Sequence, residues 1–407
     1  MTKKAELLAP AGNFEKLEIA IHYGADALYL SGQEFSLRNL SGNFTPEELK
    51  RGIDLAHEAG VKVYVAINAF LRNAELDLLR EEVARTREMS PDAFIVADPG
   101  ALQIVRETAP QVPIHLSTQA NTTNAEAARF WRSAGVSRIN TARELSLREI
   151  SEIAAGVDIE IEAFVHGAMC ISYSGRCLIS AALTGRDSNR GECTQPCRWR
   201  YRLEEETRPG KYLPVMEDGR GTYIMNSRDL CMVGHIPALV EAGISSFKVE
   251  GRMKGIGYLA PVIKCYREAI DAYYEDPSAF TVKDEWLEEL SRVNSWGYST
   301  GFYFGDPTEI EPNFANERPT TVHRLAAKVL SGGNSPKVDV RNKVIAGSEI
   351  EIIGKRGEAT KAKVEKIRDK WGGELKEANP GKQVTFELGV NCEVNDLLRI
   401  GEDYTHS

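Results

Sequence analysis

Long hydrophobic runs are missing from this sequence of 407 residues. Although 42% of the residues are hydrophobic, no stretch approaches the roughly 18 apolar residues of a membrane-spanning helix. The opening residues, MTKKAELLAPAG, include two lysines but lack the continuous apolar segment of a secretory signal. Both absences predict a protein that has no membrane segment and works in the cytoplasm.

A strong excess of positive charge is missing as well. The net charge is -9, which argues against a surface that is basic all over and attracts nucleic acid everywhere. The charge is uneven, however, because residues 318–407 carry 16 Lys and Arg against 13 Asp and Glu. Most of this excess lies in residues 355–370. The asymmetry indicates either a polyanion-binding module or the solvated charged face of a small β domain.

Cysteine is scarce outside one segment, which is rich in Gly, Ser and Arg. Five of the seven cysteines lie there: Cys170, Cys177, Cys193, Cys197 and Cys231. The other two, Cys265 and Cys392, stand alone in apolar patterns, which is typical of small buried side chains.

Three interpretations of the cysteine segment stay open: an iron–sulfur cluster, a zinc site, and a catalytic or incidental role. A disulfide framework is disfavoured, because the chain is long enough to bury a core and lacks a secretory signal. Structural zinc sites usually contain two close cysteine pairs, and only Cys193 and Cys197 approach that spacing. A four-thiolate iron–sulfur cluster accepts more scattered ligands, because folding brings them together.

Eight short apolar runs alternate with amphipathic helix patterns in the first 275 residues. The runs lie at 6–9, 27–30, 62–67, 93–97, 114–117, 138–139, 159–165 and 247–249. Two helix starts carry capping boxes, Thr45 with Glu48 and Ser146 with Glu149. Eight strands with intervening helices predict an α/β fold, a (β/α)8 TIM-like barrel over residues 1–275. A cysteine-rich insertion at about 166–243 precedes the last strand.

Short strand patterns with turn residues between them return near the end of the chain. A strap or linker at 276–318 separates them from the barrel, and it contains Gly, Ser, aromatic residues and prolines. The even spacing of the strand patterns predicts a small C-terminal β-barrel domain over residues 319–407.

Polar residues follow the expected barrel strands at the points where the apolar runs end. Catalytic residues of such barrels lie at the C-terminal ends of the strands. The candidates at these positions are Asn68, Asp98, Gln119, Asn121, Arg143, His166, Glu250 and Arg252. Any one of them is equally well explained as a helix cap or a loop hydrogen bond, but their number favours a site. Among them we expect His166 and Glu250 to transfer protons.

Three parts of the chain resemble the collagenase-like peptidase family, peptidase family U32. They are ELLAPAGNFEKLEIAIHYGADALYL, EAFVHGAMCISYSGRCLIS followed by CTQPCRW, and MNSRDLCM with HIPALVEAGISSFKVEGRMK. Glu162 to Ser180 satisfy the family pattern E-x-F-x-x-G-[SA]-x-C-x-x-x-x-G-x-C-x-[LIVM]-S. The third part and the appended β domain make the chain most similar to the tRNA hydroxylation branch of this family.

This resemblance implies oxygen-independent hydroxylation of RNA rather than proteolysis. It implies a 4Fe-4S cluster with the ligands Cys170, Cys177, Cys193 and Cys231. Cys197 is then the spare cysteine. It also implies tRNA as the partner, its wobble uridine as the base converted to 5-hydroxyuridine, and prephenate as the hydroxyl donor. The source of electrons stays open.

The implied substrates indicate which side chains would bind them. Prephenate carries two carboxylates, which arginine and lysine recognise. The candidates for donor binding are Arg143, Arg176, Lys248 and Arg252. A uridine that leaves its stack needs polar contacts and an aromatic platform. The candidates for these contacts are Asn68, Gln119 and Tyr173.

Two other functions stay open. Proteolysis, which the family name announces, has little support, because the sequence contains neither HExxH nor G-x-S-x-G. His166 and Cys170 would form a catalytic pair only if the segment that joins them were helical. A non-catalytic RNA-binding module with structural zinc would keep the basic β domain and need no cluster.

Overall fold

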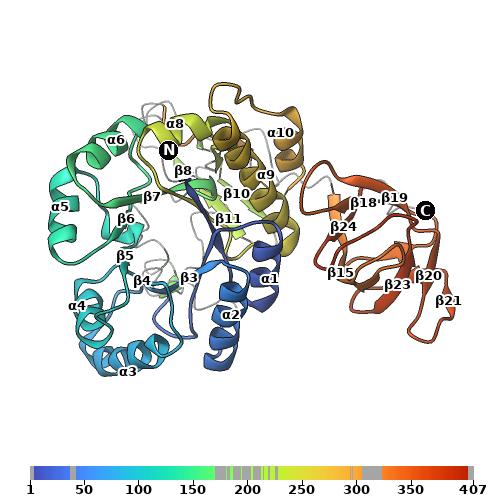
Figure 1. Cartoon of the computed structure of the whole chain (residues 1–407), viewed down its shortest axis with the longest axis horizontal. Coiled ribbons are helices and arrows are strands. Elements are labelled where there is room, and N and C mark those ends of the chain that lie inside the picture. The colour runs from blue at the N-terminus through green and yellow to red at the C-terminus, as the bar shows by residue number, and fades with distance from the viewer. Residues whose placement is uncertain are drawn as a thin grey trace.

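The chain forms an α/β barrel and a separate C-terminal β domain, as a computed structural model shows (Figure 1). The structure describes residues 4–36, 43–169, 180, 184–186, 194, 203–204, 212–213, 215–218, 221–224, 228–293, 295, 297–304 and 323–401. The predicted fold class, a TIM-like barrel followed by a β domain, is confirmed.

Eight parallel strands close the barrel. In order around it they are β1 (Glu6–Pro10), β2 (Ala27–Leu30), β3 (Lys62–Ile67), β4 (Ala93–Val96), β5 (Ile114–Leu116), β6 (Arg138–Asn140), β7 (Glu160–Gly167) and β13 (Ser246–Val249). The barrel is closed because β13 pairs in parallel with both β7 and β1. All eight strands therefore end at the same end of the barrel, which we call the C-terminal rim.

Helices surround the strands (Figure 1). They are α1 (Phe14–His22), α2 (Pro46–Glu58), α3 (Leu76–Arg87), α4 (Pro99–Thr108), α5 (Ala125–Ser133), α6 (Leu147–Gly156), α8 (Ile236–Glu241), α9 (Ile256–Glu275) and α10 (Asp284–Ser291). Among the described residues, short 3-10 turns accompany them: η1 (Asn73–Glu75), η2 (Thr118–Ala120) and η5 (Val233–His235). Among the helices of the described residues, none is long and apolar enough to cross a lipid bilayer.

Both predicted capping boxes are present, which explains where two of the helices begin. Thr45 accepts a hydrogen bond from the Glu48 backbone N at 3.2 Å, and Glu48 accepts one from the Thr45 backbone N at 3.0 Å. Ser146 and Glu149 repeat this arrangement at the start of α6. These contacts satisfy backbone N–H groups that have no partner within the helix.

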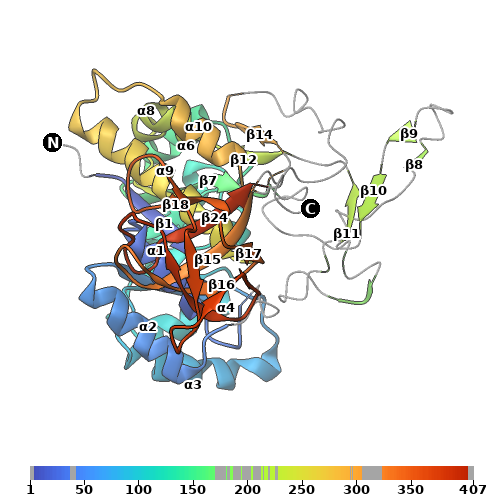
Figure 2. The same cartoon turned by 90° about the vertical axis from the view of Figure 1, so that its right-hand side faces the viewer.

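Additional strands lie between β7 and β13. They are β8 (Leu203–Glu204), β9 (Tyr212–Leu213), β10 (Val215–Asp218), β11 (Gly221–Ile224) and β12 (Asp229–Cys231). Strand β12 pairs antiparallel with the end of β7, and β14 (Tyr298–Ser299) pairs in parallel with β12. Figure 2 shows β8–β11 beyond the same end of the barrel as β12 and β14. The chain between β7 and β13 therefore returns to the C-terminal rim.

The C-terminal domain is antiparallel and has its own apolar core. Its strands are β15 (His323–Ser331), β16 (Lys337–Val340), β17 (Val344–Ile345), β18 (Glu349–Ile353), β19 (Thr360–Lys363), β20 (Lys366–Arg368), β21 (Glu374–Leu375), β22 (Glu377–Ala378), β23 (Gln383–Glu387) and β24 (Leu397–Gly401). Eight of them form one sheet, in the order β19-β18-β24-β15-β16-β23-β20-β21.

The C-terminal domain packs against the barrel through apolar and charged contacts. Ile353 and Leu397 belong to the hydrophobic core of the barrel. The Tyr23 hydroxyl on α1 donates to the Ile353 carbonyl at 2.6 Å. Arg399 on β24 forms two hydrogen bonds with the Glu289 carboxylate on α10, at 2.5 and 2.8 Å. Buried pairing of this kind holds β18 and β24 next to α1 and α10.

Candidate active site

The interior of the barrel is mostly apolar along β1 to β4, where Glu6 on β1 is charged, and mostly polar along β5, β6, β7 and β13. Strands β1 to β4 contribute an apolar cluster: Leu8, Ala27, Tyr29, Tyr64, Ala66, Ala93 and Ile95. Strands β5, β6, β7 and β13 contribute buried polar side chains: His115, Arg138, Asn140, Glu162, Ser246 and Lys248. The barrel core is filled by inward-facing side chains. A charge buried there is costly unless an opposite charge pairs with it, so these charged side chains must neutralise one another.

Four charged side chains form ion pairs inside the barrel. The Arg138 guanidinium lies 2.6 Å from Glu6 and 3.6 Å from Glu162. The Lys248 ammonium donates to Glu162 at 2.7 Å and lies 4.5 Å from the centre of the Tyr29 ring. Burial opposes the charge on Arg138, but Glu6 and Glu162 raise its pKa above the usual value. Lys248, a candidate for donor binding, therefore lies inside the barrel and already pairs with a carboxylate.

Arg143 and Glu250 meet at the C-terminal rim, although they follow different strands. Their charged groups are 3.9 Å apart, and the side chains are only 10% and 15% exposed. The Arg143 guanidinium also lies 4.1 Å from the centre of the Phe164 ring. Gly167 permits the close approach of Glu250, because a Cβ atom on it would lie 2.3 Å from the Glu250 carbonyl oxygen. Its φ of 106° is also one that glycine tolerates best.

His166, the other predicted proton-transfer residue, is fully buried at the end of β7. The rings of Tyr258, Tyr266 and Tyr298 surround it at 5.8, 5.5 and 5.3 Å between centres. Neither ring nitrogen has a hydrogen-bond partner among the residues that the structure describes. Burial lowers its pKa to about 3, so the imidazole is neutral near pH 7. A neutral imidazole offers one donor and one acceptor.

Cys231 lies beside His166, because the two residues are paired in the ladder between β12 and β7. Its sulfur is 4.0 Å from the Tyr266 hydroxyl, and burial raises the pKa of the thiol. The other predicted ligands, Cys170, Cys177 and Cys193, lie outside the described residues, as do Cys197, Arg176 and Tyr173. Within the described part of the chain, no group of three or more ligand-type side chains could hold a metal ion.

The position of Cys231 is compatible with a shared cluster. Strand β7 ends at Gly167, and Cys170 follows three residues later. A chain of three residues spans at most about 11 Å. The length of the chain therefore permits Cys170 to share a cluster with Cys231, which is paired with His166 near the end of β7. Because burial raises the pKa of the Cys231 thiol, the free thiol is a poor nucleophile, whereas a bound metal would deprotonate it.

Asn68 and Gln119 also come together at the C-terminal rim. The Asn68 amide nitrogen lies 3.3 Å from the Ser117 hydroxyl and 3.4 Å from the Gln119 amide oxygen. Ser117 in turn donates to Gln119. These three side chains come from the ends of β3 and β5 and form one polar group.

Arg252 lies on the other side of the rim and is 3% exposed. Its guanidinium donates to Ser36 at 2.9 Å and to Asn43 at 2.6 Å, and it also contacts Ser31. Its carbonyl oxygen accepts a hydrogen bond from Lys16 at 2.8 Å. Arg252 thus holds together the chain that follows β2 and the chain that follows β13.

The sequence analysis missed Asn140, which the structure places among the candidate residues. Asn140 is the last residue of β6, is 2% exposed and lies opposite Glu162 of β7. Arg138 points into the barrel, and strand alternation turns Asn140 inward as well. Among the described residues, neither polar atom of its amide has a hydrogen-bond partner. Leaving such a group unsatisfied costs about 1–3 kcal/mol, so a buried water or a bound ligand must pair with this amide.

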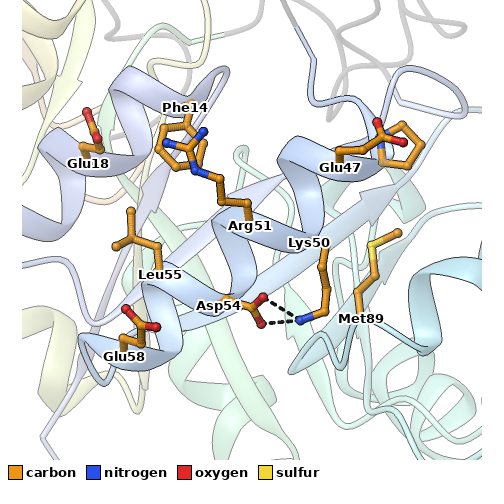
Figure 3. A pocket seen from close by; sticks show the side chains of 10 residues that line it. Phe14, Glu18, Glu47, Lys50, Arg51, Asp54, Leu55, Glu58 and Met89 are labelled. Carbon is orange, nitrogen blue, oxygen red and sulfur yellow. Dashed lines mark hydrogen bonds and ion pairs between the residues drawn. The ribbon is translucent and has the colours of Figure 1, made fainter.

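A surface pocket of about 790 Å³ lies elsewhere, on the outer helices α1 and α2 (Figure 3). Its lining is mixed in charge: Phe14, Glu18, Pro46, Glu47, Lys50, Arg51, Asp54, Leu55, Glu58 and Met89. Lys50 is paired with Asp54, and Arg51 covers the Phe14 ring. This pocket contains none of the residues at the strand ends, so the C-terminal rim is the better candidate site.

Comparisons with known proteins cover nearly the whole chain. The model of peptidase family U32 matches residues 12–313, and that of the peptidase family U32 C-terminal domain matches residues 323–399. The chain is 41% identical to tRNA hydroxylation protein P1 of Bacillus subtilis, over 99% of this chain and 96% of that protein. It is 37% identical to tRNA hydroxylation protein P of Escherichia coli, over 87% of each. The 23S rRNA 5-hydroxycytidine C2501 synthase of Escherichia coli is 35% identical, over 67% of this chain and 40% of that protein.

Proposed function

The chain belongs to peptidase family U32, and from this membership we propose that it hydroxylates RNA. The observation that carries the proposal is the 41% identity with a tRNA hydroxylation protein over 99% of the chain. Identity of this extent includes both the barrel and the C-terminal domain. In its finer form, the reaction converts the wobble uridine of a tRNA to 5-hydroxyuridine without molecular oxygen.

The reaction needs a donor of oxygen and a path for electrons. Replacing a ring C–H by C–OH oxidises the pyrimidine by two electrons, which the hydroxyl donor or another acceptor must take up. We propose prephenate as the donor and a 4Fe-4S cluster held by Cys170, Cys177, Cys193 and Cys231. A cluster held by four thiolates would supply one-electron transfer.

The protein's own side chains would bind and orient the two substrates. Arg143 can recognise a carboxylate of the donor, and the 3.9 Å between its guanidinium and the Glu250 carboxylate at the C-terminal rim supports this role. The Glu250 carboxylate can accept the proton that leaves the ring carbon. The Asn140 amide can pair with the edge of a pyrimidine, which presents a donor and an acceptor side by side. His166 can donate or accept one hydrogen bond as a neutral ring.

Proteolysis by a cysteine–histidine pair has weaker support. Burial raises the pKa of Cys231 and lowers the pKa of His166. Both shifts oppose the thiolate–imidazolium pair that a cysteine peptidase uses. These shifts oppose nucleophilic attack by Cys231, whereas Cys170, the partner first considered for His166, lies outside the described residues.

The experiment that tests the proposal starts from protein purified without oxygen. Iron, sulfide and zinc are measured first, and the protein is then incubated with unmodified tRNA, prephenate and a reductant. We expect about four irons and four sulfides per chain, and 5-hydroxyuridine in the digested tRNA by mass spectrometry. Stoichiometric zinc without iron after reconstitution would contradict the cluster. The absence of any hydroxylated nucleoside in RNA from fully loaded protein would contradict the function.

Matched cysteine variants make this experiment specific. Cys231→Ser should lose both iron and hydroxylation, because it removes a proposed ligand. Cys392→Ala is the control, since this cysteine is buried in the core of the C-terminal domain. Its iron content and activity should match those of the unaltered protein.

A further inference from the structure

An asparagine at the C-terminal rim carries an amide that no described residue holds in one orientation. Asn140 ends β6 and is 2% exposed. Neither its amide nitrogen nor its amide oxygen has a hydrogen-bond partner among the described residues. The amide nitrogen of Asn68, in contrast, lies 3.3 Å from the Ser117 hydroxyl and 3.4 Å from the Gln119 amide oxygen. Hydrogen bonds therefore orient the amide of Asn68 and leave that of Asn140 to its ligand.

The side chain of Asn140 faces the inside of the barrel. Ile139, the residue before it, packs into the hydrophobic core that the strands share with the surrounding helices. Arg138 lies on the other side of Ile139 and reaches Glu6 and Glu162 inside the barrel. Successive side chains of a strand point to opposite faces, so Asn140 lies on the same face as Arg138. It is one layer closer to the C-terminal rim, because it is the last residue of the strand.

Polar and aromatic side chains flank Asn140. Continued by one residue, the register of the ladder between β5 and β6 sets Ser117 beside Asn140. On the other side Asn140 is paired with Glu162 of β7, and Phe164 follows on the same face of that strand. The Arg143 guanidinium lies 4.1 Å from the centre of the Phe164 ring. A ligand that enters from the rim and reaches Asn140 therefore meets a hydroxyl group on one side and an aromatic ring with a cation on the other.

The chemistry of a carboxamide indicates which ligand suits it. Its NH2 group donates and its carbonyl oxygen accepts, side by side. A carboxylate only accepts, so it satisfies the amide nitrogen and leaves the amide oxygen unpaired. The carboxylates of prephenate therefore suit Asn140 less well than a nucleobase does. The Watson–Crick edge of a pyrimidine presents a donor and an acceptor at neighbouring atoms, which pair with both ends of the amide.

Uracil and cytosine present these two groups in opposite order. Uracil donates from N3 and accepts at O4, whereas cytosine accepts at N3 and donates from its amino group at C4. An amide that other hydrogen bonds hold in place matches one order only. The Asn140 amide can turn over about its last side-chain bond and match either order, since no described residue favours one orientation.

We propose that Asn140 pairs with the edge of the target base and that this contact accepts cytosine as well as uracil. The substrate class of the site is then a pyrimidine rather than uridine alone. The inference rests on the proposed function for the choice of an RNA base. A contact of this kind held in one orientation favours its matching base by roughly 5- to 150-fold. The turning amide of Asn140 should make the two bases differ by less than about threefold.

The test measures RNA binding by the full, cluster-loaded chain without prephenate, so that no base is altered. Fluorescence anisotropy gives the Kd of anticodon stem-loops whose target position carries uridine, cytidine, 3-methyluridine or an abasic site. We expect the uridine and cytidine stem-loops to bind within about threefold of each other and at least about tenfold more tightly than the abasic one. The 3-methyl group replaces the hydrogen that the amide oxygen accepts, so the 3-methyluridine stem-loop should bind like the abasic one.

Two variants show whether Asn140 makes this contact. Asn140→Leu keeps the size of the side chain and removes its donor and acceptor. Its affinity for the uridine and cytidine stem-loops should fall about tenfold, while Tm stays the same or rises, because a buried amide without a partner is removed. His115→Phe is the matched control: His115 is also buried in the barrel, and its Nδ1 lacks a partner among the described residues. Because His115 lies one layer deeper, level with Arg138, this variant should leave every Kd unchanged.

The outcomes distinguish this inference from the proposed function. If the uridine stem-loop binds and is hydroxylated once prephenate is added, but the cytidine stem-loop binds no better than the abasic one, the inference is overturned and the proposed function stands. Unchanged affinities in Asn140→Leu would also overturn it, because another group would then hold the base and water would pair with the amide. If both pyrimidine stem-loops bind equally but the loaded protein hydroxylates neither, the proposed function falls while the contact with Asn140 stands.

Discussion

Replacement of Lys248 by methionine tests whether this lysine stabilises the barrel. Its ammonium lies 2.7 Å from Glu162, and the two side chains are only 6% and 2% exposed. Methionine has a similar length but no charge, so the variant leaves Glu162 buried with Arg138 at 3.6 Å as its remaining charged partner. Breaking one partner of a buried pair costs about 3–5 kcal/mol. Because Arg138 compensates in part, we expect a loss of about 3 kcal/mol, which lowers Tm by roughly 4–5 °C in a chain of this size.

A double variant shows whether the loss comes from the unpaired carboxylate. In Glu162→Gln with Lys248→Met, both charges disappear together. The double variant should be less destabilised than the sum of the two single variants, with a coupling energy of about 2 kcal/mol. A buried glutamine still needs hydrogen bonds, so the double variant should not regain full stability.

Urea unfolding followed by circular dichroism measures these differences, with midpoints compared at equal m-values. Lys50→Met is the matched control, because Lys50 pairs with Asp54 on the surface of α2 and both side chains are about half exposed. A surface pair of this spacing contributes about 0.3–0.5 kcal/mol. If Lys248→Met were within about 1 kcal/mol of the unaltered protein, the reasoning would be refuted, and a role of Lys248 in donor binding alone would be favoured.

Three further predictions concern other parts of the chain. Asn140→Ala should lower the hydroxylation rate by at least tenfold while leaving Tm nearly unchanged, because its amide has no partner among the described residues; a large fall in Tm would show a structural role instead. Gly167→Ala should destabilise the rim and reduce activity, since the new Cβ would lie 2.3 Å from the Glu250 carbonyl oxygen at a φ of 106°; an unchanged melting curve would contradict this close approach. Acidification should weaken the contact between the two domains. Limited proteolysis measures this effect as the rate of cleavage between the domains. Although burial opposes the charged form of Glu351, Arg399 beside it and Arg292 at the end of α10, 3.7 Å away across the interface, lower its pKa. The contribution of ionised Glu351 to this contact is therefore complete above about pH 4.3 and is lost as the pH falls through the lowered pKa of Glu351 in the folded protein. Equal cleavage between the domains at pH 3 and pH 7 would contradict this prediction.

Local signals in the sequence were enough to predict the fold. Thr45 and Ser146 begin helices through capping boxes that involve only residues three apart, so no distant contact was needed to recognise them. The order of strands followed from short apolar runs between amphipathic helices, which almost always form parallel strands with helical crossovers. This order also predicted that polar residues after the strands would share one rim.

The sequence alone did not predict which of those residues meet. Arg143 with Glu250 and Asn68 with Gln119 join strand ends that are distant in the chain, and closure of the barrel brings them together. Asn140 was missed because its short strand carries charged and polar residues, so periodicity did not extend the strand to it. The ligands expected at Cys170, Cys177 and Cys193 lie outside the described residues and stay predictions.

The sequence by itself determined the elements, their order and the end of the barrel at which chemistry is expected, because these depend on neighbours within a few residues. The tertiary structure alone decided that Lys248 points inward to Glu162 and that Arg252 binds the chain after β2. Lys248 lies within the buried strand β13, Arg252 follows this strand by three residues, and both faces of a parallel barrel strand are covered. Alternation along such a strand therefore does not reveal which face a charged side chain takes. Only the partner that is available across the barrel determines which face the charged side chain takes.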